Sequence, residues 1–300
     1  MTFLLALALM TLALTGTGPT MTSSVVVWTR PLNIGPGGAN SISVGPKGVY
    51  VGGGDELRRY DFDGNIVWTR QIGATPPVTP PAYVSGVAVG PRGVHVVGGE
   101  GRDAFVALYS FEGAMIWTRH FETGPFASAT SVSADSGAVY VGGIAQVSKG
   151  NGYAFVTKFD SNGDELWSQR IQSRILTAIS VGPRGVYVTE SYDGFYPTQG
   201  SFKDTFFTAF VLDGHTLWTK QLNNETLLIE CGGPATLSVG STGIYVADNT
   251  CLRAPSTGVV YVSFIRKYDF GGNELWTRWS RTVGGASGVW NQNPRNIGRF

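Results

Sequence analysis

The stretch RYDFDGNIVWTRQ at residues 59–71 decides the fold, because variants of it return four more times along the chain. The variants are LYSFEGAMIWTRH (108–120), KFDSNGDELWSQR (158–170), FVLDGHTLWTKQ (210–221) and KYDFGGNELWTRW (267–279). In every copy a glycine stands four residues before the tryptophan and an aromatic residue stands eight before it. From Trp68 to Trp276 the tryptophans are 49, 50, 51 and 58 residues apart. A unit of about 50 residues therefore organises the chain.

The other half of each unit is equally regular. It reads VGPKGVYV (44–51), VGPRGVHV (89–96), SADSGAVYV (133–141), VGPRGVYV (181–188) and VGSTGIYV (239–246). Each unit is typical of four short strands joined by glycine turns, and successive apolar residues predict sheets that are buried on both faces. Sheets packed face to face around an axis meet that need, so we expect an all-β fold, a β-propeller of four-stranded antiparallel blades. Large fillers between its blades are expected at Trp28, Trp68, Trp117, Trp167, Trp218 and Trp276.

These units resemble the β-propeller repeat of secreted prokaryotic proteins. Their D-x-x-G-N-x-x-W portion is also similar to the repeat of quinoprotein (pyrroloquinoline-quinone-type) propellers. The resemblance covers about residues 24–290. It implies a ring of blades and no single activity, because such repeats serve many functions.

The chain begins and ends with partial units. Five complete units occupy about residues 40–280, preceded by VVVWTRP (25–31), which is typical of a lone outer strand. SGVWNQNPRNIGRF (287–300) faintly repeats the inner strands at 85–96. We therefore predict one propeller domain over residues 24–300 with six blades, the last composite and incomplete. The alternative is part of a seven-bladed ring.

The amino terminus predicts export. Residues 3–14 form an apolar block of 12 residues, whereas a membrane span needs roughly 18 or more. We expect residues 1–20 to be a signal peptide and the mature protein to be secreted or at the cell surface, without a membrane span. The alternative is that translation starts at Met21.

Charge and motifs exclude several classes of function. The net charge is +1 and no basic run occurs, which argues against nucleic acid as a partner. The three histidines fall at different repeat positions, and neither a nucleophile motif nor a phosphate-binding motif is present. We expect no cofactor and no metal, because the D-x-D-G-N segments place their glycine too early for a calcium loop.

Spacing within the units points to a binding face. From the residue at the position of Tyr50 to the following tryptophan the interval grows from 18 to 22, 27, 31 and 31 residues. Insertions on one face of a repeat array are typical of a binding face, although unconstrained loops also drift. The richest insertion, ESYDGFYPTQGSFKD (190–204), supplies the candidate binding residues Tyr192, Asp193, Phe195 and Tyr196.

An acidic residue follows the second strand in four of the five units, at Asp55, Glu100, Glu190 and Asp248. These carboxylates are further candidates for ligand binding near one mouth of the channel. The alternative is that they end strands with solvated charge.

Cys231 and Cys251 are the only cysteines. Counted outward from the turn GSTG (240–243), the two flanking strands bring them opposite each other to within one residue. We predict a disulfide, which fits an oxidising compartment and would close a loop of about 20 residues.

Together these features favour a secreted, non-catalytic propeller that binds protein or glycan through loops on one face, and we expect a monomer. One alternative is an extracellular enzyme with carboxylates in the channel. The other is a structural module of a larger surface protein.

Overall fold

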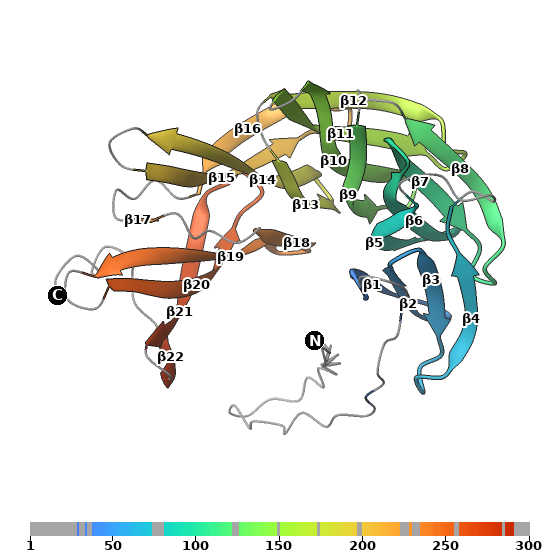
Figure 1. Cartoon of the computed structure of the whole chain (residues 1–300), viewed down its shortest axis with the longest axis horizontal. Helices are drawn as coiled ribbons and strands as arrows, with labels where there is room; N and C mark the ends of the chain where they lie inside the picture. Colours follow the sequence, from blue (N-terminus) through green and yellow to red (C-terminus); the bar gives the residue numbers. More distant parts are fainter. Residues whose placement is uncertain are drawn as a thin grey trace.

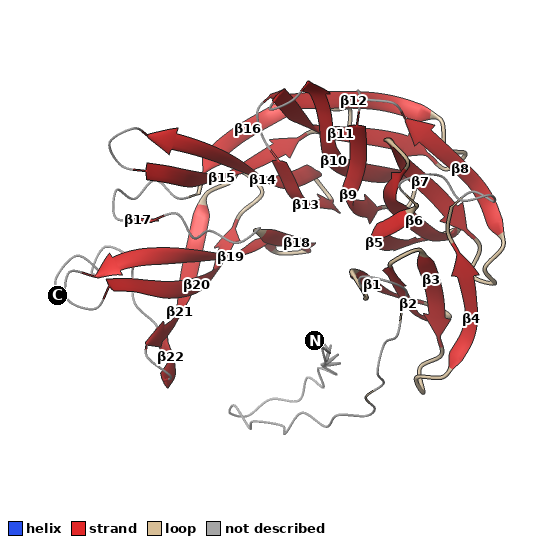
Figure 2. Ribbon diagram, viewed as in Figure 1, coloured by secondary structure: helices blue, strands red, loops and turns tan. Residues whose placement is uncertain are grey.

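The computed structural model describes residues 29, 34, 38–73, 81–121, 126–148, 151–172, 175–196, 200–222, 228–229, 235–254, 258–283 and 286–290. Within them every regular element is a strand, and the strands form five antiparallel sheets that follow one another around a common axis (Figures 1 and 2). The expected all-β architecture of four-stranded blades is confirmed.

The first three sheets are simple meanders of four strands. The first contains β1 (Ser41–Gly45), β2 (Gly48–Gly53), β3 (Glu56–Tyr60) and β4 (Ile66–Gln71). The second contains β5 (Tyr83–Gly90), β6 (Gly93–Glu100), β7 (Asp103–Tyr109) and β8 (Met115–Phe121). The third contains β9 (Phe126–Ala134), β10 (Ala138–Ser148), β11 (Asn151–Asp160) and β12 (Glu165–Gln172).

The fourth sheet repeats this order, and the fifth extends it. The fourth contains β13 (Ile175–Gly182), β14 (Gly185–Tyr196), β15 (Gly200–Phe210) and β16 (Thr216–Gln221). The fifth contains β17 (Leu228–Ile229), β18 (Thr236–Gly240), β19 (Gly243–Ala254), β20 (Gly258–Tyr268), β21 (Glu274–Val283) and β22 (Ala286–Trp290). The inner strands β1, β5, β9, β13 and β18 lie nearest the axis, each in contact with the next (Figure 1).

The hydrophobic core is divided among the interfaces between consecutive sheets and does not form a single cluster. β2 is buried along its whole length, because side chains on both of its faces meet a packed layer. Separate clusters of buried side chains fill the four spaces between consecutive sheets. The outer strands are more exposed, since only one of their edges is paired in most sheets. Burial on both faces explains why apolar residues follow one another directly in sequences such as GVYVGG.

One turn closes the outer hairpin of all five sheets. The amide of the turn glycine donates to the carbonyl three residues earlier, with φ between +78° and +96° at the five glycines. Asp61 stabilises the first copy, because its Oδ1 accepts the amides of Asp63 and Asn65 at 3.0 and 2.8 Å. The hydrogen bond from the Asn65 backbone holds the pKa of Asp61 below its usual value. These aspartates therefore serve turn geometry.

The turns of the second to fifth sheets also fit onto the tryptophan of the preceding sheet, a contact we call the tryptophan–turn joint. A Cβ on the turn glycine would lie 3.0 Å from the Trp68 ring at Gly113, 2.9 Å from Trp117 at Gly163, and 2.8 Å from Trp167 and Trp218 at Gly214 and Gly272. The indole N–H groups of Trp68, Trp117 and Trp167 donate to turn carbonyls at 3.0–3.1 Å. Basic residues two positions after the tryptophan complete three of the joints, at Arg70, Arg119 and Lys220.

Serine hydroxyl groups link the inner strand of the first sheet to that of the second, and the inner strand of the third sheet to that of the fourth. Serine Oγ atoms accept backbone amides of the following sheet at 3.0–3.2 Å, in the pairs Ser41 with Val87, Ser43 with Val89, Ser131 with Ile179 and Ser133 with Val181. The amides at the free edges of β5 and β13 thus find partners without a further strand.

The carboxyl-terminal segment differs from the expectation. Residues 287–300 were expected to supply inner strands of a composite sixth blade, but β22 pairs with the outer strand β21, with Trp290 opposite Trp279. Only two residues separate β21 from β22, and strands so close in sequence pair as a hairpin. Residues 25–28, with Trp28, residues 30–31 and residues 291–300 lie outside the described residues.

The joint predicts a sharp difference between two glycines. Gly163→Ala should lower the free energy of unfolding by about 3 kcal/mol, because alanine disfavours the positive φ and its Cβ overlaps the Trp117 ring. Gly137→Ala is the matched control, since only Asp135 Oδ1 comes within 4 Å, at 3.9 Å, and the change should stay within about 0.5 kcal/mol. Urea unfolding followed by tryptophan fluorescence measures both, and equal losses would contradict the joint.

Candidate functional site

Two-stranded ribbons extend from the fourth and fifth sheets. β14 and β15 pair from Val186 with Phe210 to Tyr196 with Gly200. The pairing of β14 with β13 ends at Ser191, and the pairing of β15 with β16 starts at Phe206. Residues 192–196 and 200–204 therefore pair only with each other among the described strands, and we call them the fourth-sheet ribbon. Figure 1 shows this ribbon and the hairpin of β19 and β20 projecting outward on the same side.

The insertions predicted as binding loops are thus strand extensions. Tyr192, Asp193, Phe195 and Tyr196 lie in β14, where their register partners are Asp204, Lys203, Ser201 and Gly200. Their side chains lie outside the described part of the chain. The growth of the interval from 18 to 31 residues lengthens a hairpin instead of adding irregular loop. The aromatic residues at 192, 195 and 196 favour strands, and this preference was the signal in the sequence that could have predicted the strand extension.

The acidic positions differ in depth. Asp55 lies in the turn between β2 and β3, and the Glu100 carboxylate lies 3.5 Å from His120 Nε2. Glu190 and Asp248 are 0% and 7% exposed. The Thr205 hydroxyl of β15 donates to Asp248 Oδ2 of β19 at 3.1 Å, so that Asp248 joins the fourth and fifth sheets. Glu190 and Asp248 stand three residues after Tyr187 and Tyr245, inside β14 and β19, whereas Asp55 and Glu100 stand five residues after Tyr50 and His95. Grouping the four by residue type alone therefore missed this burial.

No group of three or more histidine, cysteine, aspartate or glutamate side chains that could hold a metal ion occurs in the described ranges. The same part of the chain contains no helix long and apolar enough to cross a membrane.

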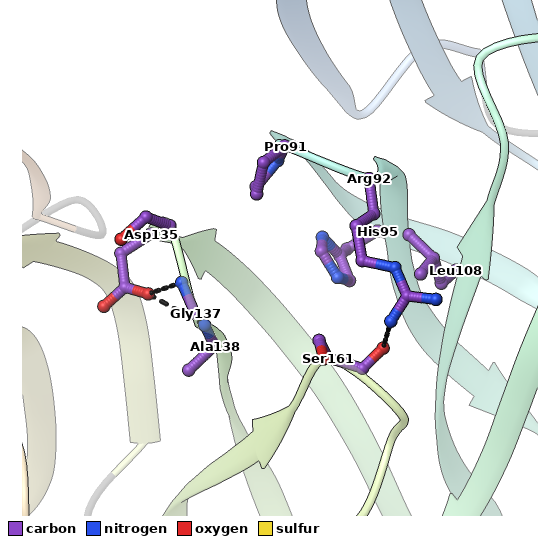
Figure 3. A pocket seen from close by; sticks show the side chains of 9 residues that line it. Pro91, Arg92, His95, Leu108, Asp135, Gly137, Ala138 and Ser161 are labelled. Atoms are coloured by element: carbon purple, nitrogen blue, oxygen red, sulfur yellow. Dashed lines mark hydrogen bonds between the residues drawn. The ribbon is translucent and has the colours of Figure 1, made fainter.

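A small cavity lies between the second and third sheets. It measures about 30 Å³ and is bordered by Arg92, His95, Asp135 and Ser161, among others (Figure 3). His95 stands where the other four sheets have tyrosine, at Tyr50, Tyr140, Tyr187 and Tyr245. Arg92 Nη1 donates to the Ser161 carbonyl at 2.8 Å, and Asp135 Oδ1 accepts two backbone amides at 2.8 Å. The volume suits a water-sized group and excludes a metabolite.

His95 is held neutral. Its side chain is buried against Trp117, with 6.0 Å between ring centroids, and its Nδ1 has no hydrogen-bond partner. Burial lowers the pKa of His95 to about 4, against a smaller opposing contribution from the backbone of Ala88. A charged imidazole would lose its hydration here, and the backbone of Ala88 offsets only part of that cost.

Acid should therefore destabilise the protein through His95. The unfolded imidazole binds a proton near pH 6.5 and the folded one only near 4, so this contribution to stability is complete above 6.5 and is lost as pH falls towards 4. The gap corresponds to about 3 kcal/mol. His95→Tyr should flatten the dependence of melting temperature on pH in this range, whereas His215→Gln, at an exposed turn, should leave it unchanged. An unaltered slope in His95→Tyr would contradict the assignment.

The cysteine register differs from the one expected. Thr236 pairs with Ala247, as counted from the turn, but Ile229 of β17 pairs with Cys251 of β19, so the register has moved by three residues. Cys231 lies outside the described residues. The disulfide between Cys231 and Cys251 stays a prediction.

Peptide mapping decides it. Without reductant, mass spectrometry should detect a linked peptide containing Cys231 and Cys251, and reduction should lower the unfolding free energy by about 3 kcal/mol on the chain-entropy model. Recovery of both cysteines as alkylated thiols from the non-reduced protein would exclude the bond.

The fold and its joints define the class of protein as a β-propeller. Within that class, residues 103–276, more than half of the chain, match the family described as outer membrane protein assembly factor BamB. The chain belongs to this family. The expected resemblance to a prokaryotic, quinoprotein-type propeller repeat is thereby confirmed.

The fold also resembles that of a solved WD40 domain. The WD40 domain of Neurospora crassa Pan2 is similar with a TM-score of 0.51 at 11% identity, over 87% of this chain and 78% of that one. A structure described as the eukaryotic initiation factor matches 86% of this chain and 68% of that one at 11% identity, with a TM-score of 0.30. At such identity the likeness concerns fold alone. No curated protein matches the sequence.

Proposed function

We propose that this protein is a non-catalytic scaffold of the cell envelope that binds other proteins through the ribbons of its fourth and fifth sheets. The observation that carries the proposal is the pairing of residues 192–196 with 200–204 and with no other described strand. Each strand of this ribbon leaves one edge of backbone donors and acceptors available. Proteins use such edges to add a strand from a partner.

The regular body of the molecule suits this role. Four joints and four buried clusters hold the sheets in fixed order, so that the ribbons rise from a rigid base. Rigid presentation reduces the entropy lost on binding. Asp193 lies opposite Lys203 and Tyr192 opposite Asp204 at the base of the ribbon, and Phe195 and Tyr196 follow towards its end. That composition is typical of protein interfaces, where tyrosine is enriched.

Family membership supports a protein partner. The family's description names the assembly of outer membrane proteins, and proteins of bacterial outer membranes are built as β-barrels. A partner rich in strands matches an open ribbon edge. Export by residues 1–20 would place the chain in the same compartment. The enzyme alternative required carboxylates open to a substrate, and the burial of Glu190 and Asp248 gives it no support.

Site-specific crosslinking in the native host tests the proposal. A photoreactive amino acid at Tyr196, at the end of the ribbon, should give a discrete crosslinked protein. The same amino acid at Phe62, which is 55% exposed in the outer turn of the first sheet, is the matched control and should give none. Replacing residues 193–203 by an Asn-Gly turn leaves the pairs up to Tyr192 and Asp204 and should abolish a crosslink from position 192.

Two results would contradict this function. One is equal crosslinking at positions 196 and 62. The other is a melting temperature raised by a glycan in the wild type but not in the shortened variant, which would identify the ribbon as a glycan site.

A further inference from the structure

The fifth sheet exposes a face that is covered in every other sheet. Ile265 lies on this face two residues before Lys267 and is 48% exposed. At the same repeat position Leu57 of the first sheet and Val156 of the third are 0% exposed, because the following sheet covers them. Trp276 is 36% exposed, whereas Trp117 at the corresponding position is 9% exposed. The exposure therefore differs because no following sheet packs on this face among the described residues, and not because the side chains differ in chemistry.

This face carries both side-chain donors that bind the turn carbonyl in other joints. In the first sheet Arg59 and Trp68 both donate to the Phe111 carbonyl, each at 3.1 Å. In the third sheet Lys158 and Trp167 donate to the Leu212 carbonyl at 2.9 and 3.0 Å. Lys267 and Trp276 hold these positions in the fifth sheet, nine residues apart as in the other two.

The surroundings of Trp276 reproduce those of the covered tryptophans. The Tyr245 ring lies 6.2 Å from it, as Tyr140 lies 6.2 Å from Trp167. The Arg278 guanidinium lies 5.7 Å from the Trp276 ring, where Arg70 lies 5.4 Å from Trp68. Without a turn carbonyl to bind, Lys267 Nζ donates to the Thr242 hydroxyl at 3.2 Å.

The inner strand offers the matching hydroxyls. Ser43 and Ser133, which accept amides of the following sheet, lie opposite Tyr50 and Tyr140. Ser238 lies opposite Tyr245 in the same way, and both Ser238 and Thr236 are exposed. The fifth sheet therefore presents acceptors for the backbone amides of one more strand, beside the donors for one more turn.

We propose that this open face, formed by Ser238, Tyr245, Lys267, Trp276 and Arg278, binds the β-sheet edge of a partner protein that carries a glycine turn like those of the four internal joints. The four internal joints define what fits: a carbonyl for Lys267 and Trp276, and a residue without Cβ within 3.0 Å of the indole ring. This surface is separate from the ribbons, and the inference does not depend on the function proposed for them.

The described part of the chain offers no equivalent occupant. Its five glycine turns close the five described sheets, and four of them already lie on tryptophans. Before Trp28, Ser24 stands where the other copies have glycine, and the four described joints leave no room for a Cβ at that position. The first sheet of a second copy is also unsuited, because Val49, Val51 and Tyr60 on its other face are buried against Ile34.

A cyclic hairpin peptide tests the surface. The probe carries AFVLDGHTLW (209–218), whose turn occupies the Lys158 and Trp167 joint, and is closed by a second Asn-Gly turn. Cross-strand NMR contacts establish the hairpin before titration. A fluorescent label on the peptide then reports binding to the full chain by anisotropy.

Saturable binding to the wild type is expected. Trp276→Ala should weaken it about tenfold or more, and Lys267→Ala, which removes one hydrogen bond, about three- to tenfold. Leu275→Ser is the matched control: Leu275 is 53% exposed and adjacent to Trp276 in β21, and the change should leave affinity within about twofold. In the peptide, Gly214→Ala should weaken binding about tenfold, because its Cβ would overlap the indole ring.

Four results would overturn the proposal. The proposal fails if the folded hairpin does not bind at millimolar concentration. Equal affinity for the wild type and Trp276→Ala places the peptide elsewhere. Binding that requires deletion of residues 1–28 would assign the face to that segment of the chain. Self-association in sedimentation that is lost in Trp276→Ala would assign it to a second copy.

Discussion

The structure depends on one close contact, that of a glycine turn with the face of an indole ring. The space at this contact is less than 3.1 Å from an added Cβ to the ring, so only glycine fits, and the turn needs a positive φ that glycine also favours. Two independent demands thus fall on one residue. At three of the four joints the indole N–H also donates to the turn carbonyl, so that a hydrogen bond as well as a close contact connects consecutive sheets.

Because the joint is repeated, stability is distributed along the array. Each sheet packs against its neighbours in sequence, and the buried clusters are separate. Arrays of this kind gain stability from nearest-neighbour interfaces rather than from one centre. A local defect such as the His95 cavity is confined to one interface, where the hydrogen bond from Arg92 to Ser161 still connects the second and third sheets.

The sequence predicted most of the fold because its signals are local and repeated. The spacing of glycine and tryptophan determined the number of strands in each blade and their order. It failed where the chain departs from its own repeat: β22 follows a two-residue link to the nearest free edge, and the register of Cys251 moves between β18 and β17. Neither the pairing of β22 nor the change of register produces a repeated pattern in the sequence. The burial of Glu190 and Asp248 was missed because residue type alone grouped them with Asp55 and Glu100, although they stand two positions earlier in the repeat, within the long strands β14 and β19.

The serine contacts of the inner strands have an evolutionary consequence. They recur at β1 and β9, in alternate sheets, and Thr236 and Ser238 continue the series at β18. A unit that brings its own tryptophan, its own glycine turn and its own hydroxyls needs no change in its neighbours when it is copied or lost. Blade number in such a lineage can change by recombination alone, while selection acts on the hairpins that rise from each blade.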